Sequence, residues 1–267
     1  MSANANGHYA PVNGLNMYYE IHDDTPGGAS AGVPLVLLHG ATMTIDGCFG
    51  RVIGPLAGTR RIIAVEQQAH GHTADIDRPL TYEQMADDVA ELLRQLHIQQ
   101  ADFFGFSMGA VTSLHIAVRH PTLVRNIVSA SGLYNNEGYL PVILESIHNT
   151  DPVNSDQWAG EIKKEFLRIA PRPEQWPAPI AKTRDVVLAF RGIQPDQLRG
   201  IQSPTLIMTG DADAIRLEHT VEMFRLLPHA QLAVFPGTDH GTMMNNAEWL
   251  MSMVPRFLDR PADRLPV

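Results

Sequence analysis

The sequence has little cysteine, no long apolar run and no block of basic residues. Its 267 residues include one cysteine, Cys48, which excludes an internal disulfide framework and fits a reducing compartment such as the cytoplasm. No apolar run reaches the length of a membrane span, and residues 1–7 lack the basic and apolar regions of a secretory signal peptide. A net charge of −9 without a Lys- or Arg-rich block argues against binding to nucleic acid or to an anionic membrane. We therefore expect a cytoplasmic protein with a small-molecule partner, and whether it forms a homo-oligomer stays open.

Signals for cofactors and metals are also missing. The glycines of Gly105–Gly109 are not followed by the Lys of a phosphate-binding loop. His70-Gly71-His72 has too few further ligands nearby for a zinc site. We predict that the protein uses neither a metal nor a cofactor, and that His39 and His70 make hydrogen bonds in loops beneath the site.

Short apolar runs alternate with helical patterns along most of the chain. Asn13-Gly14, between two alternating stretches, predicts an opening β-hairpin. Further strands are expected at residues 34–38, 61–66, 103–106, 124–130, 204–209 and 231–235. Strands that alternate with helices predict an α/β fold with a mostly parallel sheet covered by helices on both faces. Ligands of such sheets bind beyond the carboxyl ends of the strands.

The strand rhythm stops between about residue 134 and residue 200. This stretch contains helical patterns near 141–148, 156–169 and 180–190, which are separated by prolines. We expect residues 134–199 to form a helical lid inserted between the sixth and seventh strands, with 1–133 and 200–267 forming the core. Its aromatic side chains and a neighbouring methionine are candidates to line a pocket: Met43, Tyr134, Trp158 and Trp176. An apolar pocket with few charges favours an uncharged, apolar substrate.

The most informative motif is Gly105-Phe106-Ser107-Met108-Gly109. An apolar strand precedes it and a helical pattern follows at once, which is the strand–turn–helix context of a nucleophile elbow. Such a turn pushes the Ser107 hydroxyl to the top of the sheet, and side chains at the two glycines would collide with the neighbouring elements. The pentapeptide alone also fits a plain turn, so its meaning depends on partner residues further along the chain.

A base and an acid follow in separate loops. A serine hydroxyl needs a base at neutral pH, and His240 lies directly after the last predicted strand. Asp213 follows the preceding strand and is our preferred acid. The alternative, Asp211, comes directly after a turn glycine, where an aspartate ordinarily bonds backbone amides. Asp239 is less suited because it adjoins His240, and neighbouring side chains in a loop usually diverge.

The chain order Ser, Asp, His is that of the α/β-hydrolase arrangement. The sequence resembles the α/β-hydrolase family over essentially its whole length, including an eight-stranded sheet and a lid. The matching features are His39-Gly40, His70-Gly71, the elbow, Gly210-x-x-Asp213 and Asp239-His240-Gly241. Residues 66–73 depart from the Asp-x-Arg-Gly-His-Gly-x-Ser often found there, so we expect this loop to be supported differently.

The resemblance implies roles for individual residues. Ser107 would be the nucleophile, His240 the base and Asp213 the acid of a catalytic triad. The backbone amides of Ala41 and Met108 would form the oxyanion hole. A serine in this place argues against haloalkane dehalogenase and epoxide hydrolase chemistry, for which the resemblance would demand Asp.

The resulting hypothesis is a carboxylesterase-type serine hydrolase. It would cleave a carboxylic ester, lactone or thioester through an acyl-enzyme. Two alternatives use the same triad: a carbon–carbon bond hydrolase of aromatic ring-cleavage products, and a cofactor-free perhydrolase, whose elbow often reads Gly-Phe-Ser-Met-Gly. An alternative from another class is a ligand-binding protein on the same fold without turnover.

Overall fold

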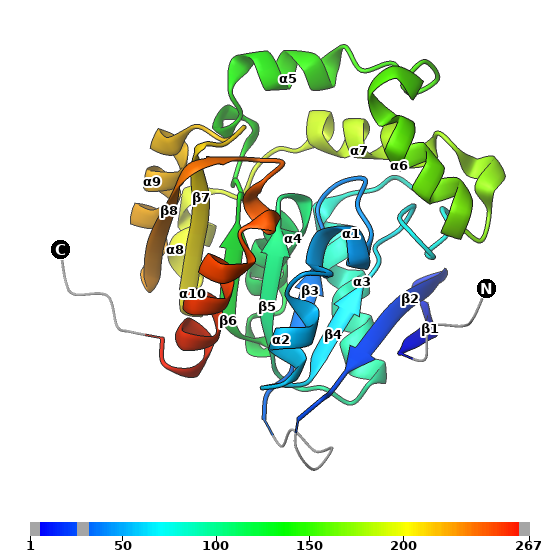
Figure 1. The fold of residues 1–267 in the computed structure, drawn as a ribbon. Helices are drawn as coiled ribbons and strands as arrows, with labels where there is room; N and C mark the ends of the chain where they lie inside the picture. The colour runs from blue at the N-terminus through cyan, green and yellow to red at the C-terminus, as the bar shows by residue number, and fades with distance from the viewer. Residues whose placement is uncertain (1–5, 26–31, 262–267) are drawn as a thin grey trace.

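A single eight-stranded sheet forms the centre of the molecule in the computed structural model, which describes residues 6–25 and 32–261 (Figure 1). The strands lie in the order β1-β2-β4-β3-β5-β6-β7-β8. Their bounds are β1 Gly7–Val12, β2 Leu15–His22, β3 Leu35–Leu38, β4 Ile62–Val65, β5 Ala101–Phe106, β6 Val124–Ala130, β7 Thr205–Ala212 and β8 Ala230–Asp239. β2 pairs antiparallel with both β1 and β4, and the remaining pairs are parallel.

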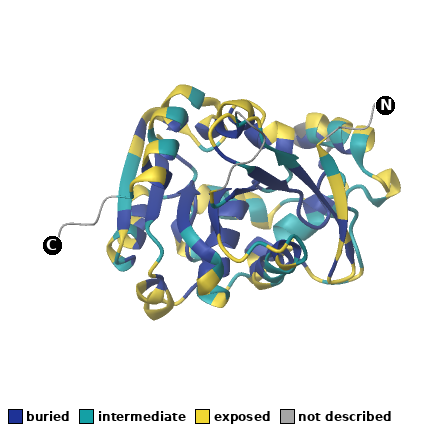
Figure 2. Ribbon diagram, turned by 90° about the horizontal axis from the view of Figure 1, so that it is seen from below, coloured by how far each residue is buried: buried dark blue, intermediate teal, exposed yellow. Residues whose placement is uncertain are grey.

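Helices cover both faces of the sheet. Their bounds are α1 Ile45–Phe49, α2 Ile53–Ala57, α3 Tyr82–Gln95, α4 Met108–Arg119, α5 Pro141–His148, α6 Asp156–Ile169, α7 Ala178–Ala189, α8 Pro195–Gly200, α9 Leu217–Leu226 and α10 Ala247–Asp259. Successive strand residues point to opposite faces, so Val36 and Leu38 join one core cluster with α3 and α4, while Leu35 and Leu37 join another with α1, α2 and α10. The central strands β3, β4 and β5 are buried throughout, and the exposed positions lie on the outer helices, the loops and other strands of the sheet (Figure 2). The predicted mostly parallel eight-stranded sheet with helices on both faces is confirmed.

Two local features differ from the sequence-based expectation. The sequence pattern of residues 46–57 is that of one helix, but the structure has two short helices there, α1 and α2, separated between Phe49 and Ile53. β7 and β8 extend beyond the expected 204–209 and 231–235, and they stay paired as far as Ala212 and Asp239 across a bulge. This extension matters for the site because it carries both strands into the loops that follow.

The chain between β6 and β7 contains helices and no strand among the elements described. α5, α6 and α7 lie above the carboxyl ends of the strands (Figure 1), whereas α8 contacts α4 and α9 on the face of the sheet. Lys182 of α7 connects this layer to the loop after β4, since its Nζ lies 2.7 Å from the Asp75 carboxylate. Division at residues 133/134 and 199/200 into core and lid stays a prediction. In the residues described, no helix combines the length and apolar character needed to cross a membrane.

Candidate active site

Ser107 occupies a strained turn between β5 and α4. Its φ of 52° and ψ of −114° lie in a region that non-glycine residues avoid, at a typical cost of about 1–3 kcal/mol. Hydrogen bonds hold the turn: the Ser107 amide donates to Ala130, and the Ser107 carbonyl accepts from the amides of Ala110 and Val111. The strain therefore presents the hydroxyl at the carboxyl end of the sheet.

The two glycines of the elbow are required by close backbone packing. A Cβ atom at Gly105 would overlap the backbone of Gly109, and one at Gly109 would overlap the carbonyl of Leu38. Glycine at both positions therefore allows α4 to begin directly against β3 and β5. The spacing Gly-x-Ser-x-Gly follows from this contact rather than from the chemistry of the serine.

His240 lies between Ser107 and Asp213. Its Nε2 is 3.0 Å from Ser107 Oγ, and its Nδ1 is 2.7 Å from Asp213 Oδ1. An ionised carboxylate only accepts hydrogen bonds, so Nδ1 carries the proton. In a neutral imidazole, Nε2 then accepts the hydrogen bond from the serine hydroxyl. The three side chains thus form the series that the sequence analysis proposed.

The β7–β8 register explains why Asp213 and His240 meet. Ala212 pairs with Asp239, so the next residue of each strand enters its loop at the same level. Gly210 permits this approach, because a Cβ atom there would overlap the carbonyl of Thr238. Two residues that are 27 positions apart in sequence become neighbours as a direct result of strand pairing.

Asp213 is enclosed by hydrogen-bond donors. It is 4% exposed, and besides His240 it accepts from the Ser131 hydroxyl and from the Ile215 amide at 3.2 Å. Burial raises the pKa of this carboxyl, but the His240 contact and the other donors outweigh burial and leave the pKa below its usual value. Asp213 is therefore held ionised beside His240.

The other two aspartates considered from the sequence have different partners. Asp211 is exposed, and its carboxylate accepts from the Thr238 amide at 3.2 Å, which matches the backbone role expected for it. Asp239 accepts from the amide and the hydroxyl of Thr242. The His240 ring instead has Asp213 on one nitrogen and Ser107 on the other.

The amides of Ala41 and Met108 lie beside the serine. Ala41 lines the same pocket as Ser107, and Met108 begins α4, where the first amides of a helix have no intrahelical acceptor. Within residues 6–25 and 32–261, neither amide donates a hydrogen bond to another protein group. A helix N-terminus also favours negative charge. These two donors can therefore receive an oxygen that develops negative charge, and their catalytic use stays a prediction.

Two buried histidines support the loops beneath Ser107. His39 donates from Nδ1 to the Gly40 carbonyl and accepts the Gln67 amide at Nε2, at 2.7 and 3.1 Å. Nδ1 of His70 donates to the Gln68 carbonyl at 2.8 Å, and its Nε2 accepts the Thr42 amide at 2.9 Å. Burial lowers the pKa of His39 to about 3 and that of His70 to about 4, so both rings are neutral near pH 7. The prediction that these histidines make hydrogen bonds in the loops is confirmed.

The loop after β4 is supported by a buried glutamate. Glu66 accepts from the amide and Nδ1 of His72, and a Cβ atom at Gly71 would overlap its carboxylate. The hydrogen bond to Glu66 raises the pKa of His72. This effect outweighs burial, which lowers the pKa, so the pKa lies above its usual value. This is the different loop support expected from the departure of residues 66–73 from the family pattern.

A pocket of about 240 Å³ opens at Ser107 and His240. Aliphatic side chains from α5 and α7 form much of its wall: Ile143, Ile147, Ile180 and Val187. Arg184 of α7 also lines it, and its Nη1 donates to the Thr150 carbonyl while Nε and Nη2 contact Asp185. The pocket is therefore mainly apolar with one cationic group in its wall.

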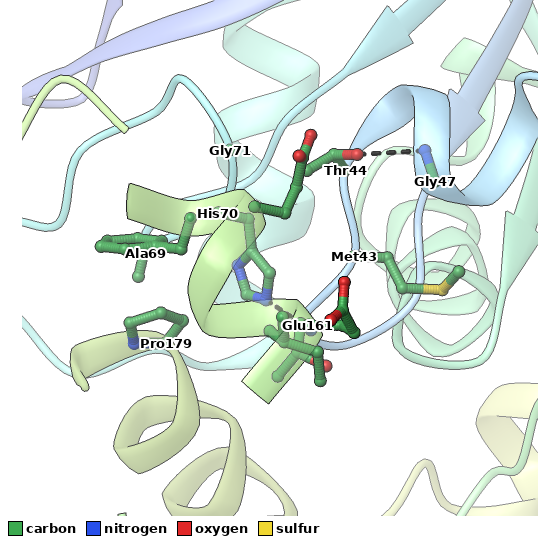
Figure 3. A pocket seen from close by; sticks show the side chains of 12 residues that line it. Met43, Thr44, Gly47, Ala69, His70, Gly71, Glu161 and Pro179 are labelled. Carbon is green, nitrogen blue, oxygen red and sulfur yellow. Dashed lines mark hydrogen bonds between the residues drawn. The ribbon is translucent and has the colours of Figure 1, made fainter. Parts of the chain in front are cut away.

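A second pocket, of about 220 Å³, shares Thr42 with the first, and Figure 3 shows its wall. Its wall combines the loop after β3, the loop after β4 and residues of helices α1, α6 and α7. Met43, Ala69, Phe166 and Pro179 make it largely apolar, and Glu161 and Glu165 of α6 also contribute. The two pockets have Thr42 as a common lining residue, whereas Ser107 and His240 line only the first.

The four side chains proposed from the sequence to line the pocket are placed elsewhere or not described. Met43 lines the second pocket. Tyr134 is buried against His219, with the ring centroids 4.3 Å apart, and Trp176 contacts Phe166. The side chain of Trp158 lies outside the described residues. The sequence reasoning favoured aromatics and missed the aliphatic wall, although the four-residue spacing of Ile143 and Ile147 marks one face of α5.

Comparison with protein-family models identifies the family of this chain. The model of the alpha/beta hydrolase family matches residues 35–252. The chain is 26% identical over 245 residues to a 2-hydroxymuconate semialdehyde hydrolase of Pseudomonas putida, which covers 85% of this chain and 87% of that protein. It is 27% identical over 249 residues to a 2-(acetamidomethylene)succinate hydrolase of Mesorhizobium japonicum, covering 85% and 88%.

Solved structures show the same fold. An enol-lactonase from Burkholderia xenovorans superposes with a TM-score of 0.76 at 20% identity, covering 95% of this chain and all (100%) of that one. A meta-cleavage product hydrolase from Pseudomonas fluorescens superposes with a TM-score of 0.74 at 18% identity, covering 95% and 97%. At these identities the similarity concerns the arrangement of the chain and not its substrate.

Proposed function

This chain belongs to the alpha/beta hydrolase family, and from that premise we propose that it is a serine hydrolase acting on a carboxylic ester, lactone or thioester. The observation that carries the proposal is the contact series from Ser107 through His240 to Asp213, at 3.0 and 2.7 Å. A nucleophile, a base and an orienting acid in hydrogen-bond contact are the elements of acyl transfer. The amides of Ala41 and Met108 complete the proposed site.

The first half of the reaction forms an acyl-enzyme. Ser107 Oγ attacks the carbonyl carbon while His240 Nε2 takes the hydroxyl proton. The carbonyl oxygen becomes an oxyanion and accepts from the Ala41 and Met108 amides, which stabilise it where the charge develops. The ionised Asp213 stabilises the imidazolium by accepting from Nδ1. When the tetrahedral intermediate collapses, the bond to the leaving oxygen breaks and His240 Nε2 gives that oxygen its proton.

The second half releases the acid. A water molecule takes the place of the departed alcohol, and His240 Nε2 accepts its proton as it attacks the acyl carbon. The same two amides receive the second oxyanion. Collapse of this intermediate breaks the bond to Ser107 Oγ, which recovers its proton from His240. The enzyme returns to its starting state, with ester and water converted to acid and alcohol.

The pocket walls support an apolar substrate. The pocket at Ser107 is lined mainly by aliphatic side chains, and the second pocket beyond Thr42 is also largely apolar. Transfer of apolar groups from water into such pockets is favourable in proportion to the area buried. An uncharged, apolar ester or lactone fits these walls.

Arg184 favours a second candidate, carbon–carbon bond hydrolysis of an acid. Its guanidinium lines the pocket at Ser107, and a guanidinium binds carboxylates well. The substrates named in two relatives, 2-hydroxymuconate semialdehyde and 2-(acetamidomethylene)succinate, are carboxylic acids. The same triad would then serve a substrate with a carboxylate directed at α7. The perhydrolase alternative rests on the elbow sequence alone.

Turnover of matched substrates tests the proposal. We expect wild-type protein to hydrolyse p-nitrophenyl butyrate and the Ser107→Ala variant, folded as judged by circular dichroism, to lose this activity. A dienone ring-cleavage product, assayed in parallel with and without peroxide, distinguishes ester from carbon–carbon and perhydrolase chemistry. If the wild type turns over none of these and a fluorophosphonate leaves Ser107 unlabelled, the proposal is wrong and a binding protein is the better description.

A further inference from the structure

We propose that His70 is a positioning residue for the oxyanion hole. By accepting the Thr42 amide at Nε2, it would fix the turn Gly40–Met43, from which the Ala41 amide points to the oxyanion. This inference rests on the proposed function, because it assigns the Ala41 amide to that reaction. It makes the rate depend on a residue outside the series Ser107–His240–Asp213.

The turn at residues 40–43 needs an external support. It is closed by the Met43 amide, which donates to the Gly40 carbonyl at a long 3.3 Å. Thr42 has a φ of 59°, in the left-handed region that disfavours residues with a Cβ atom. Rotation of the peptide between Ala41 and Thr42 would relieve that φ and move the turn. A group that binds the Thr42 N–H in its present direction opposes this rotation.

His70 is built to be such an acceptor. Its Nδ1 donates to the Gln68 carbonyl, which leaves the lone pair on Nε2. The ring is 2% exposed, so water does not compete for Nε2. Burial lowers the pKa of His70 to about 4, which keeps Nε2 unprotonated at neutral pH; the neighbouring Asp75 opposes this effect only in part. The tautomer and the charge state are therefore both fixed for accepting one N–H.

His70 is itself held by the loop that carries it. Its amide donates to the Gln67 carbonyl, and its carbonyl accepts from the Thr73 amide, at 3.0 and 2.9 Å. Figure 3 shows the ring extending from this loop toward the loop after β3. The hydrogen bond to Thr42 therefore transmits the position of the loop after β4 to the turn beside Ser107. His39 cannot replace it, because its Nε2 accepts from the Gln67 amide.

Substitution at His70 tests the role. Leucine removes the acceptor at similar volume, whereas glutamine places an amide oxygen near the position of Nε2. Because loss of one oxyanion donor costs about 10²–10³-fold in kcat, we expect His70→Leu to lower kcat at least tenfold and to change KM less than threefold. His70→Gln is expected to recover most of the lost kcat. The matched control is His115→Leu, which removes a buried imidazole of α4 whose Nε2 has no hydrogen-bond partner in the described part of the chain.

A second measurement separates positioning from a general loss of structure. A trifluoromethyl ketone forms a tetrahedral oxyanion adduct with the serine, whereas the product acid binds without one. We expect His70→Leu to reduce the affinity for the ketone by the same factor as it reduces kcat/KM. The affinity for the product acid is expected to stay unchanged. Equal losses for both ligands, or kcat values for His70→Leu and His115→Leu that agree, would overturn the proposal. Absence of wild-type ester turnover would instead defeat the proposed function itself.

Discussion

Two regions of the molecule meet at Ser107 and are built differently. The first is the set of loops at the carboxyl ends of β3, β4, β5, β7 and β8, which we call the sheet-edge loops. Several of their polar side chains are buried with defined hydrogen-bond partners, as Asp213 and His70 illustrate. The second is segment 134–199, where α5 buries no residue completely and Val142 and Val153 are 67% and 76% exposed.

The difference separates chemistry from selectivity. Groups that transfer protons must be held within a few tenths of an ångström, and a dense hydrogen-bond network on a rigid sheet provides this. Walls that receive apolar groups need only shape, and helices with few constraints can provide it. We therefore expect substitutions in the sheet-edge loops to change the rate for every substrate, and those in segment 134–199 to change which substrate is preferred.

The largest expected effect comes from the nucleophile. Ser107→Ala removes the atom that attacks, and in serine hydrolases of this kind the loss is about 10⁶-fold in kcat. The melting temperature is expected to stay the same or rise, since the smaller alanine side chain makes no new contact that could disturb its neighbours. Measurement of ester turnover and thermal unfolding on the same preparation checks both. A residual rate within tenfold of wild type would remove Ser107 from the mechanism.

Asp213 and Asp211 offer the next comparison within one loop. Asp213→Asn would leave His240 Nδ1 facing an amide, which destabilises the tautomer that the reaction needs, and we expect kcat to fall by about 10⁴-fold. Asp211→Asn alters only a contact to the Thr238 amide, so we expect a change below threefold. Steady-state kinetics of both variants decide the matter, and the opposite ranking would assign the acid role to Asp211.

Acid is expected to destabilise the folded protein, in part through buried histidines of the sheet-edge loops. His39 and His70 have pKa values lowered by burial to about 3 and about 4, below the value near 6.5 of the unfolded chain. The unfolded state therefore binds more protons, and the free energy of unfolding falls as the pH decreases from 6.5 toward 4. Each histidine contributes up to about 1.4 kcal/mol per pH unit in this window.

Urea unfolding at several pH values measures this slope. His70→Gln removes one of the histidines whose pKa burial lowers, which also include His39, His115 and His219, so its slope between pH 6.5 and pH 4 is expected to be smaller than that of the wild type. Identical slopes would mean that His70 is not held neutral in the folded protein.

In segment 134–199 we expect an effect on rate that depends on the charge of the substrate. Arg184→Gln removes the cation from the pocket wall, and a hydrogen bond to a charged group is worth about 1.5–3 kcal/mol. For an ester with a terminal carboxylate on its chain we expect kcat/KM to fall about 10–100-fold, and for the uncharged ester of equal length less than threefold. Arg168→Gln on α6, where Glu165 pairs with the arginine, is the matched control. Equal changes for the two esters would exclude Arg184 from substrate recognition.

Local sequence patterns predicted the sheet-edge loops better than segment 134–199. Strand residues such as Leu35–Leu38 are apolar without interruption because helices cover both faces, and this signal is visible in four residues. Each of the three triad residues follows such a strand: Ser107, Asp213 and His240. Their shared position after a strand was enough to predict that they approach one another. Even the separate roles of Asp211 and Asp213 followed from their distance to a turn glycine.

Features that depend on packing between distant segments were not accessible in this way. The ion pair between Lys182 and Asp75 joins two segments whose local sequences give no sign of it. The pocket wall depends on how α5 and α7 lie over the sheet, and so Tyr134, buried against His219, could not be distinguished from a wall residue. A pocket wall is formed by several helices together, whereas strand periodicity can be seen within one segment of the sequence.

The central claim is that Ser107 is an activated nucleophile, and covalent labelling tests it most directly. Folded protein is treated with a fluorophosphonate, digested and mapped by mass spectrometry. The account predicts a phosphonyl group on Ser107 of the wild type, much slower labelling of His240→Ala, and no label on denatured protein. A wild type that stays unlabelled, or that carries the label on another residue, would contradict it.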